Sequence, residues 1–236
     1  MLGLVETSAE RSTPTSQTTL AYSRLRSDVL AGRLAPGERL KVLDLAKALE
    51  VSPGAIREAL SRLVPEQLVV SREQKGFAVA PLSIEDLEDL TDLRCEVEAI
   101  ALRRSVARGD SEWEAAVLAT AHRLRRTPSQ TSETDKSLSP EWVERHAAFH
   151  AALVAACGSQ RLLAFHAQLY EQSERYRGLA THLETNRNVD SEHQHLVDAA
   201  LDRNADLLVE LMLTHMRKTT AKIVSGARGV QAKSIA

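Results

Sequence analysis

Residues 51–60 read Val51-Ser-Pro-Gly-Ala-Ile-Arg-Glu-Ala-Leu60, and they predict a helix that begins directly after a tight turn. Ser52 is a favourable N-cap, and Pro53 suits the first helical position because the amide hydrogen that proline lacks would have no helical partner there. Residues 40–49 predict a short amphipathic helix before the turn at Glu50 and Val51. Two short helices joined in this way are typical of a helix-turn-helix, which reads DNA through its second helix.

The apolar residues of the two predicted helices recur at helical spacing and are expected to form one small core. They are Leu45, Ala46, Leu49, Val51, Ile56, Leu60 and Leu63. The start of the second helix then stays exposed, where side chains can reach base edges in the major groove. The candidate DNA contacts there are Ser52, Gly54, Ala55 and Arg57. Glu58 is interpreted as a residue that orients a neighbour or caps a backbone group.

Other signals complete a small domain over residues 18–80. Apolar and polar residues alternate with helical period over residues 18–31, which predicts a helix with Leu20, Leu25, Val29 and Leu30 on its apolar side. Gly32 ends this predicted helix. The β-prone runs 68–71 and 77–79 flank a polar segment that contains Gly76, which predicts a β-hairpin. Residues 17–80 carry 10 Lys and Arg against 7 Asp and Glu, whereas residues 81–236 carry 19 against 23. The basic part is thus the part with the DNA-binding motif.

Length and composition limit the remaining possibilities. The 236 residues suffice for two domains, and 3% aromatic residues favour helices packed through aliphatic side chains. No apolar run approaches 18 residues, so no membrane span is expected. Residues 1–17 are rich in Ser and Thr and show no signal-peptide pattern, which indicates a disordered tail on a cytoplasmic protein. Cys95 and Cys157 lie in helical patterns and are expected to be reduced core residues.

Residues 82–226 predict an all-helical domain, an antiparallel bundle without strands. The expected helices cover residues 83–108, 111–126, 141–156, 160–183, 185–202 and 205–225, with a polar loop over 127–140 and a frayed tail over 227–236. The fold class is therefore mainly α, with a winged helix-turn-helix followed by an antiparallel α-helical bundle.

Histidines carry the chemistry of this second domain. His146 and His150 lie four residues apart and share one helix face, while His193 and His215 lie on two later helices. Four neutral imidazoles from neighbouring helices make a suitable site for a divalent transition metal. The alternative is that several of them are surface or hydrogen-bonded core histidines. His122, His166, His182 and His195 are assigned structural or solvent roles.

The first domain resembles the winged helix-turn-helix regulators of the GntR superfamily. The matching segments are residues 32–40 (Gly-Arg-Leu-Ala-Pro-Gly-Glu-Arg-Leu), residues 51–60, and residues 76–79 (Gly-Phe-Ala-Val). The resemblance implies that Arg57 contacts a base or a phosphate and that Gly76 is the tip of a wing near the minor groove. Arg39, Lys41 and Lys75 are expected to contact phosphates. Pro53 stands where the family commonly has Arg, which predicts a different operator.

The second domain resembles the ligand-sensing FCD domain of the fatty-acid-regulator subclass of GntR proteins. The matches are His146-Ala-Ala-Phe-His150, Glu192-His193 and His215. The resemblance implies a metal held by His146, His150, His193 and His215. His146 replaces the usual Asp, which favours Zn²⁺, with Ni²⁺ or Mn²⁺ as the other candidates. The alternative is that His146 turns away and three histidines bind the metal.

The same resemblance implies a small carboxylate effector bound beside the metal. Arg94 matches the family's arginine, either as an effector clamp or in an ion pair with Glu98. Tyr170, Gln172 and Arg175 are expected to line the cavity or a dimer contact. The segment from Tyr170 and residues 54–56 resemble the carbon-starvation repressor group of the subclass.

The predicted protein is a homodimeric transcriptional regulator, and a repressor, that binds a double-stranded DNA operator and senses a small organic acid at a metal site. It is not expected to be an enzyme. One alternative is a metalloenzyme in which the histidine site activates water, with Glu144 or Glu192 as the base. The other alternative is a DNA-binding dimer without an effector.

Overall fold

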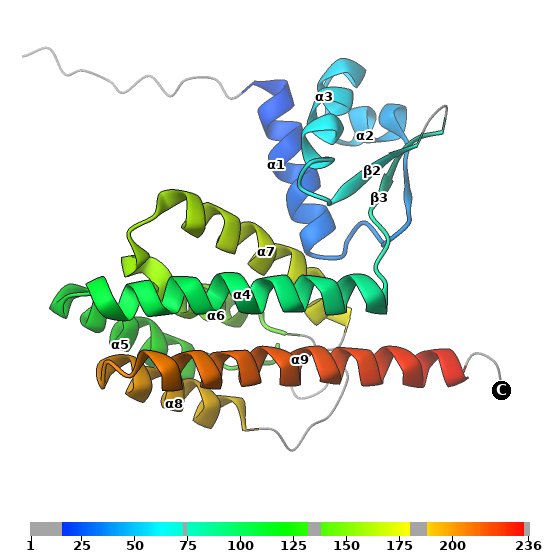
Figure 1. Cartoon of the computed structure of the whole chain (residues 1–236). Coiled ribbons are helices and arrows are strands. Elements are labelled where there is room, and N and C mark those ends of the chain that lie inside the picture. Colours follow the sequence, from blue (N-terminus) through cyan, green and yellow to red (C-terminus); the bar gives the residue numbers. More distant parts are fainter. Residues whose placement is uncertain (1–15, 73–74, 132–137, 180–187, 234–236) are drawn as a thin grey trace, which may run out of the picture. The chain divides into compact units, whose positions relative to one another are not determined.

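A computed structural model describes residues 16–72, 75–131, 138–179 and 188–233 (Figure 1). The chain divides into two compact units, and each is treated by itself. One unit contains the described residues up to Val29 together with Glu38–Ala80, and the other contains Leu30–Gly37 and the chain from Pro81 onward. No helix in the described ranges is both long and apolar enough to cross a membrane.

The first unit is a winged helix-turn-helix, as predicted. Its elements are α1 (Gln17–Leu30), β1 (Arg39–Leu40), α2 (Val42–Ala48), α3 (Pro53–Leu63), β2 (Val69–Arg72) and β3 (Gly76–Val79). The strands form an antiparallel sheet in the order β1-β3-β2. Ala78 of the central strand β3 pairs with Arg39 of β1 on one side and with Val70 of β2 on the other. Strand β1 was not predicted, because two residues are too few to show an alternating pattern.

The turn before α3 forms as the sequence predicts. Glu50 takes a positive φ of 54°, and the Ser52 hydroxyl accepts a hydrogen bond from the Ala55 amide at 3.2 Å. The core is smaller than expected: Ile56, Leu60 and Leu63 are fully buried, whereas Leu45, Leu49 and Val51 are only half buried. In α1 the buried face is Ala21, Leu25 and Val29. Leu20, which was placed on the same apolar side, is exposed.

The second unit is the predicted helical bundle. It consists of α4 (Ile84–Arg108), α5 (Ser111–Arg125), α6 (Pro140–Val154), the 3₁₀ turn η1 (Ala155–Cys157), α7 (Gln160–Leu179), α8 (Val189–Leu201) and α9 (Ala205–Lys233). Side-chain caps start several helices: Ser83, Asp110, Ser139 and Asn188 each accept an amide hydrogen bond three residues on. Helix α9 continues beyond the predicted end at Ser225, through part of the expected tail. Residues 132–137 of the predicted loop and 180–187 of the predicted fourth and fifth helices lie outside the described residues.

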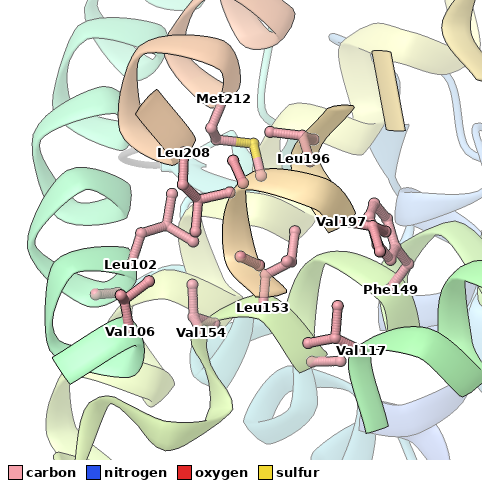
Figure 2. Close-up of a cluster of buried hydrophobic side chains, with 14 of the residues drawn as sticks. Leu102, Val106, Val117, Phe149, Leu153, Val154, Leu196, Val197, Leu208 and Met212 are labelled. Carbon is pink, nitrogen blue, oxygen red and sulfur yellow. The ribbon is translucent and has the colours of Figure 1, made fainter. Parts of the chain in front are cut away.

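Aliphatic side chains from α4, α5, α6, α8 and α9 fill the centre of the bundle (Figure 2). Leu102, Leu153 and Leu208 are fully buried there, and both free cysteines are buried, as expected of reduced core residues. Phe149 is also fully buried and packs edge-on against the rings of His150 and His193. The hydrophobic core therefore packs against one side of the His150 and His193 rings.

Candidate metal centre and DNA-binding surface

The start of α3 presents part of the predicted DNA surface. Gly54 and Arg57 are exposed, and the Ser52 side chain is the N-cap. Ala55 is 6% exposed and lies one helical turn before the buried Ala59, so its predicted role as a base contact is wrong for the side chain. Glu58 accepts a hydrogen bond from the Thr18 hydroxyl at 3.1 Å, which ties α3 to α1. That contact agrees with a supporting role for Glu58.

The strands carry the other predicted DNA contacts. Arg39 is exposed on β1, and Lys41 follows it with only a loose 3.8 Å ion pair to the exposed Asp44. Lys75 and Gly76 are exposed at the start of β3. Gly76 takes a φ of 80°, a conformation that a residue with a Cβ adopts at a cost. Because β3 pairs with β1, the sheet joins the strand that carries Arg39 to the wing strand.

The four predicted metal-binding histidines meet inside the bundle. His146 and His150 come from α6, His193 from α8 and His215 from α9. Each is at most 6% exposed, and one ring nitrogen of each lies within 4.8 Å of those of the others. The 3.6-residue period of α6 places His146 and His150 together, whereas only the packing of α8 and α9 adds the other two.

The buried surroundings keep the imidazoles of His146 and His150 neutral. Burial, followed by the charge of Arg177, holds the pKa of His146 well below its usual value. Burial also lowers the pKa of His150, with further contributions from His215 and His193. A neutral imidazole offers a nitrogen lone pair, which is the form that a metal ion requires.

The separation of His146 and His150 fits two ligands of one metal ion. The Nε2 atoms of His146 and His150 lie 3.1 Å apart. Two adjacent nitrogen ligands at Zn–N bond lengths of about 2.0–2.1 Å are separated by about 2.8–3.4 Å in octahedral or tetrahedral coordination. The Nδ1 atom of His150 is buried and has no hydrogen-bond partner among the described residues. The nitrogen that the 3.1 Å distance involves is Nε2, so the unpartnered Nδ1 is a separate feature of this ring.

Polar side chains contact the Nδ1 atoms of His215 and His146 and orient these two rings. The Glu192 carboxylate lies 2.9 Å from His215 Nδ1 and also contacts Lys218 at 3.4 Å. A carboxylate in this position fixes the tautomer that leaves Nε2 free for a metal ion. The Tyr170 hydroxyl lies 2.7 Å from His146 Nδ1, and the Trp142 ring stacks on His146 at 4.6 Å between centroids. Burial raises the pKa of Tyr170, so this hydroxyl stays protonated.

Arg177 is the residue of this site that the sequence analysis missed. Its Nη1 donates a hydrogen bond to His146 Nδ1 at 2.8 Å and lies 3.3 Å from His146 Nε2. Because a guanidinium only donates, His146 Nδ1 acts as the acceptor, and the proton of the neutral ring is then on Nε2. Metal binding through His146 Nε2 requires the other tautomer and therefore a different Arg177 contact. Arg177 follows Tyr170 by seven residues, and this two-turn spacing could have identified it.

Arg94 lies beside the cluster but does not form the expected ion pair. Its Nη1 donates to the Ser173 hydroxyl at 2.7 Å, and its guanidinium carbon lies 5.2 Å from the centre of the Tyr170 ring. Glu98 instead contacts His166 Nε2 at 2.8 Å, and both side chains are buried. The alternative of an Arg94–Glu98 ion pair is therefore wrong, and His166 has the predicted structural role. His122 and His195 are exposed, and His182 lies outside the described residues.

Both arginines and two of the histidines line one small cavity. Its volume is about 20 Å³, and Arg94, His150, Tyr170, Arg177 and His215 are among its lining residues. Such a volume holds about one water molecule, so an organic acid needs side chains to move. Burial lowers the pKa of Arg175, against smaller opposing contributions from Tyr176 and Asp86, and its side chain does not line this cavity. Gln172 is also buried without lining it, whereas Arg177, which was not predicted, does line it.

A second cavity reaches the cluster from α5 and α8. It has a volume of about 310 Å³ and is lined by Leu118, Arg125, Asp190, His193 and neighbouring residues of both helices. Of the four clustered histidines, only His193 lines this cavity, whereas His150 and His215 line the smaller one. The described residues bury the four histidines, and the two cavities border the cluster at His193 and at His150 and His215.

A winged helix-turn-helix joined to a helical bundle with a buried polar site is the architecture of a two-domain DNA-binding regulator. Comparison with protein families gives the same result. Residues 17–79 match the family of bacterial regulatory proteins named gntR, and residues 89–218 match the FCD domain. The chain therefore belongs to the GntR family and carries an FCD domain.

Curated relatives support this assignment over most of their length. The chain is 43% identical over 203 residues to an uncharacterized HTH-type transcriptional regulator, BphR of Paraburkholderia xenovorans, covering 86% of this chain and 83% of the relative. It is 37% identical over 200 residues to the HTH-type transcriptional repressor GlaR of Escherichia coli, covering 83% and 90%. The protein is thus a DNA-binding transcriptional regulator, and its relatives are regulators, not enzymes.

Solved structures share the fold. The Escherichia coli protein McbR/YncC aligns with a TM-score of 0.71 at 19% identity, covering 89% of this chain and 98% of that one. A GntR regulator from Rhodococcus sp. RHA1 gives the same TM-score at 22% identity, covering 89% and 99%. At these identities the likeness establishes the architecture alone.

Proposed function

We propose that the protein represses transcription as a homodimer on a double-stranded DNA operator, and that a small organic acid regulates it at a metal site. The acid changes operator binding if it binds one arrangement of the two winged domains better than another. The observation that carries the proposal is the convergence of four buried histidines from three helices within 4.8 Å. Repression follows the name of the relative GlaR, a transcriptional repressor.

A transition metal agrees with the donors of the site. His146, His150, His193 and His215 would hold it, and all four donors are imidazole nitrogens. Such a set favours Zn²⁺, with Ni²⁺ or Mn²⁺ as alternatives, over ions that prefer oxygen ligands. When bound, the metal would supply a positive centre for an anion. Glu192 would keep the His215 ring in its metal-binding tautomer.

The charges around the site favour an anionic effector. Arg94 and Arg177 line the small cavity next to His150 and His215, and the four neutral histidines would leave the full charge of a divalent ion uncompensated. A carboxylate placed there contacts both guanidinium groups by charge-assisted hydrogen bonds. It also gives Arg177 a partner when His146 changes tautomer. Arg177 already pairs with Glu174 at 3.3 Å, so a carboxylate adds a second negative charge to this group of cations.

Thermal unfolding in the presence of small mono- and dicarboxylic acids tests this proposal. Both tryptophans, Trp113 and Trp142, lie in the helical domain, so their fluorescence reports on it. An acid at about 100 times its Kd is expected to add about 2.7 kcal/mol to the stability of the metal-loaded protein. The same acid is expected to have no effect after EDTA treatment, and added Zn²⁺ restores it. Sodium chloride at equal ionic strength is the control.

Two outcomes would contradict the proposal. If no acid in the panel stabilises the metal-loaded protein, the histidine cluster is not an effector site. If an acid stabilises the protein equally before and after EDTA, the acid binds without the metal.

A further inference from the structure

Polar side chains join α1 to α3 in the winged unit (Figure 1). Six of them, three from each side, recur at intervals of four residues, so each set of three follows one face of its helix. They are Thr18, Tyr22 and Arg26 on α1, and Glu58, Arg62 and Glu66 on α3 and the turn that follows it. We call these six side chains the α1–α3 ladder.

The first two steps of the ladder lie along α3 itself. The Thr18 hydroxyl donates a hydrogen bond to the Glu58 carboxylate at 3.1 Å. One turn further along both helices, the guanidinium carbon of Arg62 lies over the Tyr22 ring, 4.1 Å from its centre. The two residues of each step are the same number of positions apart in the sequence. The two helices therefore run in the same direction, and their contacts advance together by one turn.

The third step ends at Glu66, which binds two side chains of α1. Its Oε2 atom accepts a hydrogen bond from Arg26 Nε at 2.8 Å, and its Oε1 atom accepts one from the Tyr22 hydroxyl. Burial, together with the Glu66 carboxylate, raises the pKa of Tyr22, so this hydroxyl keeps its proton and remains a donor. Both oxygens of the Glu66 carboxylate therefore hold α1 against the end of α3.

A further side chain of α1 fixes the beginning of α3. The backbone amide of the N-cap residue Ser52 donates to Gln17 Oε1 at 3.0 Å. In a capping box, the side chain of the third helical residue accepts this bond. Ala55 occupies that position of α3 and has no acceptor in its side chain. Gln17 therefore supplies, from the first turn of α1, the cap that α3 lacks.

We infer that the α1–α3 ladder and Gln17 position α3 for DNA recognition, so that α1 controls operator affinity through α3. This inference rests on the assignment of α3 as the DNA-reading helix. Burial of apolar side chains is non-directional, so it does not fix how far one helix is turned or displaced along another. Hydrogen bonds require particular distances and angles, and the ladder repeats them along the helix. Contacts to base edges depend on such a fixed position, because they discriminate by geometry.

Removal of single hydroxyl groups from the ladder tests the inference in the full-length protein. Thr18→Val lacks the donor to Glu58, and Tyr22→Phe lacks the donor to Glu66 but keeps its ring over Arg62. Thr18→Val is expected to lower the affinity for a duplex that the wild type selects from a random pool about threefold, and the double variant about tenfold. Affinity for a duplex of unrelated sequence is expected to stay unchanged, because phosphate contacts dominate it. Fluorescence anisotropy measures both affinities.

Matched variants separate positioning from a loss of stability. Thr18→Ser keeps the hydroxyl and is expected to bind the selected duplex as the wild type does. Thr19→Val makes the same change one residue further on, where the hydroxyl contacts Ser16 and not α3, and no change in affinity is expected. Circular dichroism melts establish a temperature at which every variant is folded. At that temperature a merely structural role of the ladder would leave both affinities unchanged.

The outcomes distinguish this inference from the assignment on which it rests. A weaker selected duplex with an unchanged unrelated duplex, and recovery in Thr18→Ser, supports the ladder. Wild-type affinity in both Thr18→Val and the double variant would overturn it, and so would an equal loss for the two duplexes, which indicates a direct phosphate contact of α1. Operator binding that survives Arg57→Ala would instead contradict the DNA-reading role of α3.

Discussion

Replacement of Arg57 by alanine is expected to abolish operator binding at protein concentrations that saturate the wild type. Arg57 is exposed in the first turns of α3, which is the helix that enters the major groove in this fold. A good arginine contact to a base is worth about 1–3 kcal/mol, and a dimer loses two of them. The operator affinity is therefore expected to fall at least thirtyfold, with about 2 kcal/mol as the smallest combined loss.

Fluorescence anisotropy with a DNA duplex selected by the wild-type protein from a random pool measures this effect. Lys47→Ala, which removes an exposed positive charge of α2 outside the predicted surface, is the matched control. The slope of affinity against salt concentration then distinguishes a base contact from a phosphate contact, because only the latter lowers the slope by about one. Unchanged affinity would contradict the assignment of α3. Joint loss of DNA and metal binding would contradict the separation of the two domains.

The double replacement His150→Ala and His193→Ala is expected to remove both the metal and the response to the acid. The two residues come from α6 and α8, so their loss removes donors from two of the three helices that form the cluster. The remaining His146 and His215 cannot supply the three or four donors of a stable site. Metal content after dialysis is expected to fall from about one ion per chain to nearly none, because the affinity of a site for its metal falls with each ligand that is removed.

Exposed histidines supply the control for this experiment. His122→Ala with His195→Ala removes two imidazoles from the surface, and metal content is expected to stay at the wild-type level. Because His150 and His193 are buried, the milder pair His150→Gln and His193→Gln keeps polar side chains of similar size. Operator binding without the acid is expected to survive in both double variants. A variant that lacks the metal yet responds to the acid as the wild type does would show that the site is wrong.

Local signals in the sequence predicted most helices well. Ser83 begins α4 as a side-chain cap, as predicted, and α6 begins within one residue of its predicted start, with Ser139 as its cap and Pro140, which had been assigned to the loop, in its first turn. Gly158 ends the α6–η1 segment with a φ of 70°, as a glycine after a helix commonly does. These residues act within one turn of their own position, which is why a single sequence suffices to identify them.

Features that depend on packing were harder to predict. Ala55 looks too small for a core residue, but it shares a helix face with Ala59 and is buried. The contact between Glu98 and His166 joins α4 to α7 across 68 residues, and no spacing rule links the two positions. The same holds for Arg177 and His146, which meet only because α6 and α7 both contribute to the site. The histidines themselves were identified because two share a helix and all four match a family pattern.

The most direct test of the account measures operator binding with and without the acid that stabilises the protein, before and after removal of the metal. Fluorescence anisotropy measures the affinity for the selected duplex in four conditions, which combine the presence or absence of the acid with the presence or removal of the metal. A fifth condition adds Zn²⁺ back to the metal-free protein in the presence of the acid. The account predicts that the acid weakens operator binding only in the metal-loaded and reloaded protein, by about five- to 150-fold for a typical coupling energy. Operator affinity that is the same with and without the acid in the metal-loaded protein would contradict it.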